Sequence, residues 1–209
     1  IKICGLTRPE EAAYCDRNSA DYAGFVLFFE KSRRNISVER AKEIMSELPQ
    51  KIRRVAVTVS PTKAQLETIA DAGFSLVQVH GEAVERLLHA SPLPVWRAVT
   101  EKEPLSWESA AYAGLLFDAV SPGSGRTFDW NRLKDSLLRE GFYEKKSPQR
   151  PQIILAGGLT ADNVAEAIRL LNPDVVDVST GVEYDGAEFR GKSPEKIEAF
   201  VRAVRQAEK

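Results

Sequence analysis

Short runs of β-branched and other apolar residues alternate with amphipathic stretches of helical periodicity along the whole chain, and eight of each can be counted. The runs expected to form strands are residues 1–4, 22–28, 54–59, 76–79, 95–99, 115–119, 153–156 and 175–178. Strands that alternate with single helices are parallel and are joined by right-handed crossovers. The alternation therefore predicts an α/β fold built on a parallel sheet.

The number of units favours one closed barrel. Dividing 209 residues by eight gives about 26 residues per unit, and a chain of this length is near the lower limit for a (β/α)8 TIM barrel. We therefore expect residues 1–209 to form a single barrel domain, with an open doubly wound sheet as the competing architecture. The polar segment 140–152 is expected to be a turn before the seventh strand, away from the chemistry.

Several helix starts carry capping signals. Thr7 with Glu10 three residues later matches a capping box, and Thr160 precedes another amphipathic stretch. Ser60 and Ser193 are each followed by proline, the arrangement expected of an N-cap before the first helical residue.

The charge balance bears on the class of partner. Lys and Arg total 29 and Asp and Glu total 30, a net charge of -1, so no overall basic field would attract nucleic acid or an anionic membrane. No apolar run approaches the roughly 20 residues of a membrane span. We expect a cytoplasmic protein with a small-molecule ligand, whose Cys4 and Cys15 are free thiols.

Two glycine-bearing segments follow the seventh and eighth predicted strands. Gly157 and Gly158 come after the seventh strand, and Thr180 and Gly181 come after the eighth. In TIM barrels a phosphate commonly binds between these two loops, where glycines let the backbone approach an anion closely. We therefore predict a phosphate site here, although glycines at strand ends are also found in turns without a ligand.

Polar or ionisable residues occur at several other strand ends, where a barrel gathers its working side chains. They are Cys4, Arg33, Arg34, Gln78, His80, Asp118 and Asp177. Each has a structural alternative: Cys4 as a small core residue, for example, or Asp177 as the counter-charge of Lys2. Asp118 is harder to explain structurally, because a carboxylate within an apolar strand is costly to bury without a partner or a function.

Cys4 and Asp118 together suggest acid–base chemistry. A thiolate can remove a proton and a carboxylic acid can donate one, but their ordinary pKa values, about 8.5 and 3.9, require shifts for this work at neutral pH. Positive charge near the thiol and burial of the carboxyl would supply those shifts. Asp129 is the rival acid, although it is also placed as a helix N-cap. No metal-ligand spacing is found, so cofactor-free proton transfer such as isomerisation is expected.

The motifs at the strand ends together resemble the phosphoribosylanthranilate isomerase family of tryptophan biosynthesis along nearly the whole chain. The resemblance rests on KICGLT (2–7), DYAGFVLF (21–28), KSRRNIS (31–37), VQVHGE (77–82), LLFDAVSPGSGRTFDW (115–130), LAGGLTADNV (155–164) and DVSTGVE (177–183).

The resemblance implies a TIM barrel that catalyses the Amadori rearrangement of N-(5-phosphoribosyl)anthranilate to 1-(2-carboxyphenylamino)-1-deoxyribulose 5-phosphate without a cofactor. It implies that Cys4 is the general base acting at the sugar C2 and that Asp118 is the general acid acting at the ring oxygen. It also implies that Arg34 binds the anthranilate carboxylate. The predicted site further contains Gln78, His80 and Asp177 as substrate-binding residues and Gly157, Gly158, Thr180 and Gly181 as phosphate-binding residues.

Some questions remain open at this point. Arg33 stands where the family usually has proline, so two adjacent arginines compete for the carboxylate. A histidine-pathway isomerase with paired aspartates, or a dual-substrate relative, is the closest alternative enzyme, and Cys4 argues against the former. A non-catalytic phosphosugar-binding module is the alternative from another class. The protein is expected to be a monomer or a homodimer.

Overall fold

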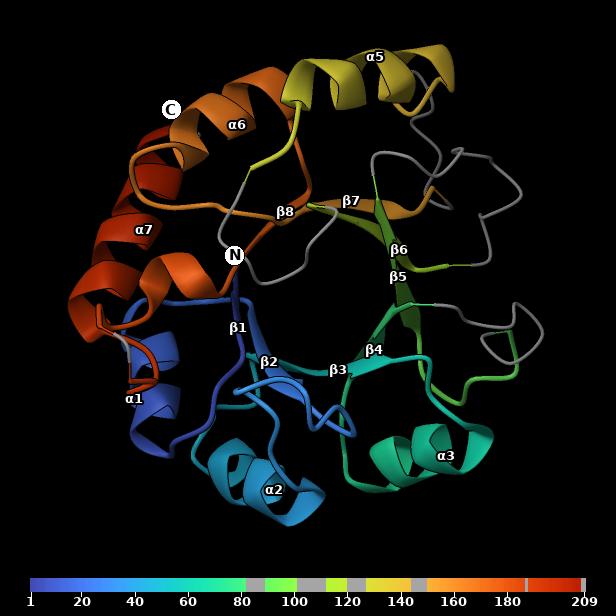
Figure 1. The fold of residues 1–209 in the computed structure, drawn as a ribbon, viewed down its shortest axis with the longest axis vertical. Coiled ribbons are helices and arrows are strands. Elements are labelled where there is room, and N and C mark those ends of the chain that lie inside the picture. The colour runs from blue at the N-terminus through green and yellow to red at the C-terminus, as the bar shows by residue number, and fades with distance from the viewer. Residues whose placement is uncertain (82–88, 101–111, 120–126, 144–149, 187, 208–209) are drawn as a thin grey trace.

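The computed structural model describes residues 1–81, 89–100, 112–119, 127–143, 150–186 and 188–207. Within these ranges eight parallel strands form a closed barrel, in which each strand pairs with the next and the last pairs with the first (Figure 1). The strands are β1 (Lys2–Cys4), β2 (Tyr22–Val26), β3 (Arg53–Val59), β4 (Leu76–His80), β5 (Val95–Thr100), β6 (Gly114–Asp118), β7 (Gln152–Leu155) and β8 (Val175–Val178). The predicted TIM barrel is confirmed and the open sheet is excluded.

The helices surround the barrel (Figure 1). Those in the described ranges are α1 (Glu10–Arg17), α2 (Val38–Ser46), α3 (Lys63–Asp71), α5 (Trp130–Arg139), α6 (Val164–Leu171) and α7 (Pro194–Ala207), with a short 3-10 helix, η2 (Thr180–Val182). The helices predicted after β4 and β5 fall largely outside the described residues. Residues 144–149 of the predicted turn 140–152 also lie outside them.

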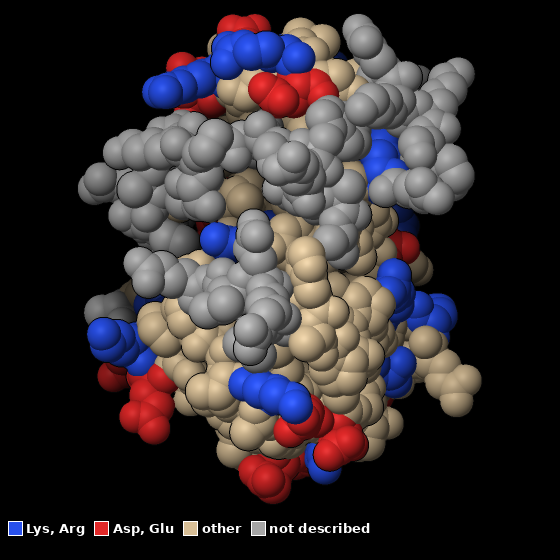
Figure 2. Space-filling model, turned by 90° about the vertical axis from the view of Figure 1, so that its right-hand side faces the viewer, with Lys and Arg blue, Asp and Glu red and all other residues tan. Residues whose placement is uncertain are grey.

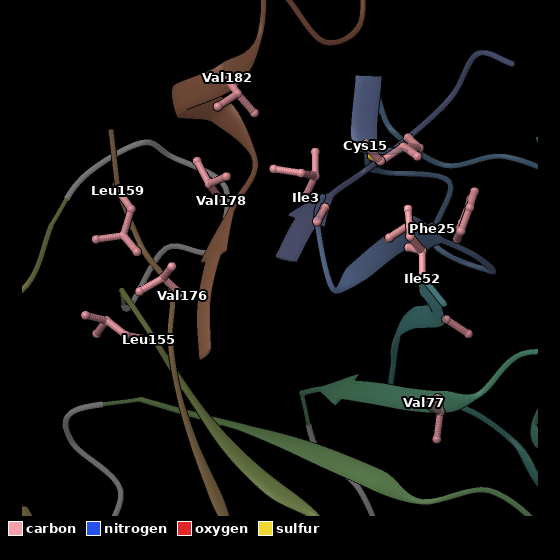
Figure 3. Packing of buried hydrophobic residues seen from close by; sticks show 14 of the residues in the cluster. Ile3, Cys15, Phe25, Ile52, Val77, Leu155, Leu159, Val176, Val178 and Val182 are labelled. Atoms are coloured by element: carbon pink, nitrogen blue, oxygen red, sulfur yellow. The ribbon is translucent and has the colours of Figure 1, made fainter. Parts of the chain in front are cut away.

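Side chains alternate along each strand between two hydrophobic layers, because successive residues of a strand point to opposite faces. Ile3 belongs to the large layer between the barrel and the helices, whereas its neighbour Cys4 belongs to the layer inside the barrel. Figure 3 shows Ile3 close to Val178, its register partner across the β1–β8 seam. This alternation places Lys2 on the same inner side as Cys4.

The end of β2 is set by backbone conformation. Leu27 still donates its N–H to the carbonyl oxygen of Val57, but Phe28 has a φ of 58° and leaves the extended region. The strand therefore ends at Val26 rather than at residue 28 as predicted.

The cap predicted from Thr7 and Glu10 is wrong. Pro9 is the N-cap of α1 and makes no side-chain cap hydrogen bond. The carboxylate of Glu11 instead accepts hydrogen bonds from the backbone N–H groups of Thr7 and Arg8 at 2.7 and 3.1 Å. Glu11 is buried and also binds the backbone of a segment before α7, a long-range contact that local spacing does not reveal.

Two further cap predictions are also wrong, and one is confirmed. Thr62, not Ser60, caps α3, in a capping box with Gln65. Helix α6 begins at Val164 after Asn163, so Thr160 belongs to the preceding turn. Ser193 does accept a hydrogen bond from a backbone N–H of the first turn of α7, at 3.2 Å. The broad element pattern was therefore easier to predict than the helix ends.

No helix in the described part of the chain is long and apolar enough to cross a membrane. On the face drawn in Figure 2, Lys and Arg side chains lie beside Asp and Glu side chains near both ends, and further Lys and Arg side chains lie between the ends among uncharged residues.

Candidate active site

One cavity of about 640 Å3 lies at the carboxyl ends of the barrel strands. Its walls include all ten predicted site residues: Cys4, Arg34, Gln78, His80, Asp118, Gly157, Gly158, Asp177, Thr180 and Gly181. These residues come from six strands or strand-following loops that are distant in the sequence. The closed barrel brings them together, as expected for the catalytic end of this fold.

Cys4 lies beside a buried ion pair on the β1–β8 seam. Lys2 Nζ is 2.8 Å from Asp177 Oδ2, and the Lys2 side chain is fully buried. The two residues are register partners of neighbouring strands. The structural alternative for Asp177, neutralisation of Lys2, is therefore confirmed, and Asp177 also lines the cavity.

The neighbouring strand leaves room for the thiol only because position 24 is glycine. A Cβ atom at Gly24, the register partner of Cys4, would be 2.9 Å from Cys4 Sγ and 3.1 Å from Lys2 Cε. Both distances are shorter than ordinary carbon contacts. Glycine therefore allows the Cys4 and Lys2 side chains to lie side by side.

The pKa of Cys4 is shifted in the direction opposite to the one expected. Burial raises the pKa of the thiol, Lys2 opposes this shift, and the Asp177 carboxylate adds to it, so the pKa lies above its ordinary value. The pKa of Lys2 is lowered by burial but raised more strongly by Asp177 and Cys4, which keeps this amine charged. The thiol is therefore protonated at neutral pH and lies next to a cation.

Asp118 has the predicted kind of shift. Burial raises the pKa of its carboxyl to about 6, while a hydrogen bond from the Ala119 backbone N–H opposes the rise. That N–H donates to Asp118 Oδ1 at 2.8 Å. A Cβ at Gly157 would be 3.0 Å from the same oxygen, so the first predicted phosphate loop packs against the carboxyl. The rival acid, Asp129, accepts hydrogen bonds from two backbone N–H groups as the N-cap of α5.

Gln78 and His80 form a polar pair on β4. Gln78 Nε2 is 2.8 Å from His80 Nε2. Burial lowers the pKa of His80 to about 4, so the imidazole is neutral at pH 7 and can accept the amide hydrogen at Nε2. Gln78 Oε1 is buried without a hydrogen-bond partner. Since a buried oxygen of this kind is costly to leave unpaired, it is available to a donor on a ligand in the cavity.

The two predicted phosphate loops touch one another. Gly157 and Gly158 have φ values of 79° and 65°, which favour glycine. Gly181 packs so closely on the carbonyl oxygen of Leu159 that a Cβ would overlap it. The backbone of both loops can therefore approach an anion without intervening side chains.

The two adjacent arginines have different positions. Arg34 is 9% exposed and lines the cavity, whereas the side chain of Arg33 is 49% exposed and is not part of the cavity wall. Arg34 Nε donates to Glu183 Oε1 at 2.6 Å, and its Nη2 donates to Thr180 Oγ1 at 2.8 Å. Arg34 is therefore the arginine placed to meet a ligand.

The chain that carries this site is similar to known proteins. The sequence profile described as N-(5'phosphoribosyl)anthranilate (PRA) isomerase matches residues 1–203. The chain belongs to this family.

Members of the phosphoribosylanthranilate isomerase family match along almost their whole length. N-(5'-phosphoribosyl)anthranilate isomerase of Streptococcus mutans is 40% identical over 207 residues, covering 99% of this chain and 98% of that protein. The crystal structure of phosphoribosyl anthranilate isomerase from Thermus thermophilus has a TM-score of 0.82 at 31% identity and covers 98% of both chains. A family structure in complex with reduced 1-(o-carboxyphenylamino)-1-deoxyribulose 5-phosphate has a TM-score of 0.77 at 31% identity, covering 98% of this chain and 97% of that one.

Next to the cavity lie two charged residues that sequence reasoning did not select. Glu183 and Lys192 are both buried and lie 3.0 Å apart at the carboxyl-end rim. Glu183 is part of the quoted DVSTGVE motif, which was the available signal, but Lys192 lies in a loop where a lysine is usually solvated. Within the described residues no cluster of three or more His, Cys, Asp or Glu side chains could hold a metal ion.

Proposed function

We propose that the protein performs the family reaction, the Amadori rearrangement of N-(5-phosphoribosyl)anthranilate in tryptophan biosynthesis, with Cys4 as general base and Asp118 as general acid. The observation that carries this proposal is that a thiol and a carboxyl with a pKa of about 6 line one cavity together with two glycine-bearing loops. A carboxyl with this pKa holds an exchangeable proton near neutrality, which suits a general acid.

The proposed reaction begins at the ring oxygen of the ribose. Asp118 gives its proton to this oxygen as the bond from the oxygen to C1 breaks, and the anthranilate nitrogen lone pair forms a C1–N double bond. The Cys4 thiolate then takes the proton from C2, and the C2–H electron pair forms a C1–C2 double bond while the nitrogen regains its lone pair. The resulting enol becomes the ketone when C1 gains a proton and the C2 hydroxyl loses its proton. Cys4 then gives its proton to solvent and Asp118 takes one up, so that both groups return to their starting protonation states.

Substrate binding is assigned to the rest of the cavity wall. Arg34 would meet the anthranilate carboxylate, because a guanidinium suits a charge-assisted contact with a carboxylate. The phosphate is assigned to the Gly157–Gly158 and Thr180–Gly181 loops, which are supported by their mutual packing and by glycine backbone geometry. Gln78, His80 and Asp177 would bind sugar hydroxyls, supported by the unpartnered buried oxygens of Gln78 and Asp177.

The test is to mix the purified protein with freshly generated phosphoribosylanthranilate and follow the loss of anthranilate-type fluorescence. Conversion at catalytic enzyme concentrations supports the proposal. The aminoaldose phosphate of the histidine pathway is assayed beside it, and turnover of both compounds would identify a dual-substrate enzyme. Saturable binding of the reduced product analogue without turnover of either compound would contradict the proposal and indicate a binding module.

We also propose that residues 1–209 act as one domain in the cytoplasm, as a monomer or a homodimer. One closed barrel that uses all eight strands supports the single domain. Both cysteines are buried free thiols, which suits a reducing compartment. Light scattering coupled to size-exclusion chromatography distinguishes the two oligomeric states, and a mass of two chains would identify the homodimer.

A further inference from the structure

Glu183 is a buried carboxylate in contact with three cationic side chains. Its Oε1 accepts hydrogen bonds from Arg34 Nε at 2.6 Å and from Lys192 Nζ at 3.0 Å. Its Oε2 accepts from Arg33 Nη2 at 2.6 Å and from Arg34 Nη2 at 3.2 Å. The Glu183 side chain is only 4% exposed. Burial alone would raise the pKa of Glu183, but Lys192 and Arg34 hold it below its ordinary value, so the carboxylate is ionised.

The contact with Glu183 fixes two of the three guanidinium nitrogens of Arg34. Nε and Nη2 bind Glu183, and Nη2 also donates to Thr180 Oγ1 at 2.8 Å. Nη1 makes no hydrogen bond to any residue that the structure describes, so its N–H groups remain for an anion in the cavity that Arg34 lines. A guanidinium held on one edge in this way loses less rotational freedom when its other edge binds a ligand.

The stem of Arg34 is also confined. A Cβ at Gly5 would be only 2.6 Å from Arg34 Cδ, so the side chain packs against the exit of β1 directly after Cys4. Gly5 has a φ of 80°, where an L-amino acid side chain would be strained. Arg34 is therefore fixed at its stem by Gly5 and at its head by Glu183.

Glu183 itself is held by the segment that precedes α7. Glu183 and Lys192 form an isolated antiparallel bridge, and the Tyr184 N–H donates to the Gly191 carbonyl oxygen. Lys192 Nζ also lies 3.2 Å from both the backbone oxygen and the Oγ of Ser179, and Ser179 Oγ donates to the Cys4 carbonyl oxygen at 3.0 Å. These bonds link Glu183 to the backbone of the proposed base.

The charges in this cluster do not cancel. One carboxylate faces Arg33, Arg34 and Lys192, so this cluster, which reaches the cavity through Arg34, carries more positive than negative charge. A substrate with a carboxylate and a phosphate would restore the balance. Glu183 can thus orient the cations without neutralising the field that attracts the substrate.

We propose that Glu183 is a positioning residue for substrate binding: it holds the Arg34 guanidinium so that its remaining edge meets the carboxylate on the aromatic ring of the substrate. This inference rests on the proposed function. It assigns to Glu183 no contact with the reacting atoms.

The test compares two substrates that differ only in the carboxylate, N-(5-phosphoribosyl)anthranilate and N-(5-phosphoribosyl)aniline. The Glu183→Gln variant keeps the size of the side chain but removes the charge. We expect it to raise KM for the anthranilate compound at least about tenfold, with a smaller change in kcat, because a charge-assisted contact is weakened. The aniline compound should be processed by Glu183→Gln and wild type with the same KM, since it lacks the group that Arg34 binds.

A matched control is Glu11→Gln. Glu11 is also buried and accepts a hydrogen bond from the Lys192 backbone N–H at 2.7 Å, but within the described residues its hydrogen bonds come from backbone N–H groups and not from an arginine side chain. Its variant should lose stability without raising KM for the anthranilate compound. A rise in KM for Glu11→Gln equal to that for Glu183→Gln would overturn the proposal, because general loosening of this region would then account for the effect.

Glu183→Asp is a second variant in case Glu183→Gln does not fold. Aspartate keeps the negative charge opposite Lys192, but its shorter side chain moves the carboxylate away from Arg34. This variant should also raise KM for the anthranilate compound only. If neither Glu183 variant raises KM selectively while wild type converts the anthranilate compound, the positioning role is wrong. If wild type converts neither compound, the proposed function fails instead.

Discussion

Cys4 at the end of β1 is buried and Asp118 at the end of β6 is half-buried on the wall of the same cavity, yet their surroundings act differently on their protons. Around Asp118, burial raises the pKa to about 6, which favours a proton donor. Around Cys4, burial also raises the pKa, although a proton acceptor needs the opposite shift. Burial alone therefore prepares the acid but works against the base.

The difference lies in the neighbouring charges. Asp118 has a backbone N–H as its nearest hydrogen-bond partner, whereas Cys4 lies beside the charged amine of Lys2 and the Asp177 carboxylate. A cation close to a thiol stabilises the thiolate, so Lys2 is the group that limits the penalty of burial at Cys4. The comparison can be tested on each side of the cavity separately.

The largest effects are expected when either proton-transfer group is removed. Cys4→Ala and Asp118→Asn should each reduce kcat by at least about 100-fold, the lower range for general acid–base groups. Steady-state turnover of phosphoribosylanthranilate measures this, with circular dichroism as the control for folding. Near-wild-type kcat in both variants would contradict the mechanism.

The stability of Asp118→Asn should depend on pH. The folded-state pKa of Asp118 lies above its unfolded value of 3.8, so the protonated carboxyl is favoured in the folded protein. The free energy of unfolding of wild type therefore falls as the pH rises from about 4 to about 6, and the deficit persists above that range. Because asparagine cannot ionise, Asp118→Asn should be more stable than wild type at pH 8 by up to about 3 kcal/mol.

At pH 3, below both pKa values, the two proteins should be equally stable, because the carboxyl is then protonated in the folded and in the unfolded protein. Urea denaturation at both pH values makes the measurement. Equal stability at pH 8 as well would show that the pKa of Asp118 is not raised.

Replacing Lys2 should act mainly on the base side, because the Lys2 amine is the main charge that lowers the pKa of Cys4 but makes only a minor contribution to the pKa of Asp118. Lys2→Met removes the cation beside Cys4, so the pKa of the thiol should rise further. The thiolate fraction at a given pH should then fall about tenfold for each unit by which the pKa rises. The rate of alkylation of Cys4 by iodoacetamide as a function of pH, read by mass spectrometry, measures this pKa.

Lys2→Met also leaves Asp177 buried without its partner, which costs about 3–5 kcal/mol of stability. A double variant, Lys2→Met with Asp177→Leu, removes both charges and serves as the control for folding in the alkylation experiment. An unchanged alkylation profile of Cys4 in both variants would show that Lys2 does not stabilise the thiolate.

The pH dependence of kcat/KM sharpens the comparison further. Below about pH 6 the activity should fall tenfold per pH unit, because the thiolate becomes scarcer while Asp118 is already protonated. Between about pH 6 and the raised pKa of Cys4 the profile should be level, since the gain in thiolate is offset by the loss of protonated Asp118. The residual activity of Asp118→Asn should instead keep rising through this range, and a level profile there would contradict the assignment of the pKa near 6.

The smallest effect is expected at the other cysteine. Cys15 is fully buried in the layer between the barrel and the helices, where burial raises its pKa to about 12. Cys15→Ala should leave kcat/KM unchanged and cost only a modest amount of stability from lost packing. A clear loss of activity at constant stability would mean that the thiol chemistry is not confined to Cys4.

The sequence was sufficient to predict the order of the strands and the side chains that gather at their carboxyl ends. Residues such as Cys4, Asp118 and Gly157 could be placed because strand number alone decides which loops meet in a closed barrel. Local spacing failed at Thr7, because the group that caps its segment, Glu11, is fixed by a distant loop. It also failed for the pKa of Cys4, because the extent of burial depends on packing from other strands.

Ion pairs between residues far apart in the chain also could not be predicted from the sequence. Arg34 and Glu183 are 149 residues apart, and neither residue type nor spacing indicates that they touch. The same holds for Lys192, whose position in a polar loop gives no sign of a buried amine. Sequence patterns identify the strand ends, but the partners of buried charges depend on how the barrel closes.

The β1–β8 seam has a consequence for the growing chain. Lys2 and Asp177 are 175 residues apart, so the amine near the start of the protein meets its counter-charge only after almost all of the polypeptide has been made. Contacts with such a large separation form late and slow the final step of folding. A nascent chain that ends before β8 therefore has neither the closed barrel nor a shielded thiol. Its Cys4 should react with alkylating reagents as rapidly as an unfolded cysteine, and protection of Cys4 in a chain truncated before residue 175 would contradict this order of assembly.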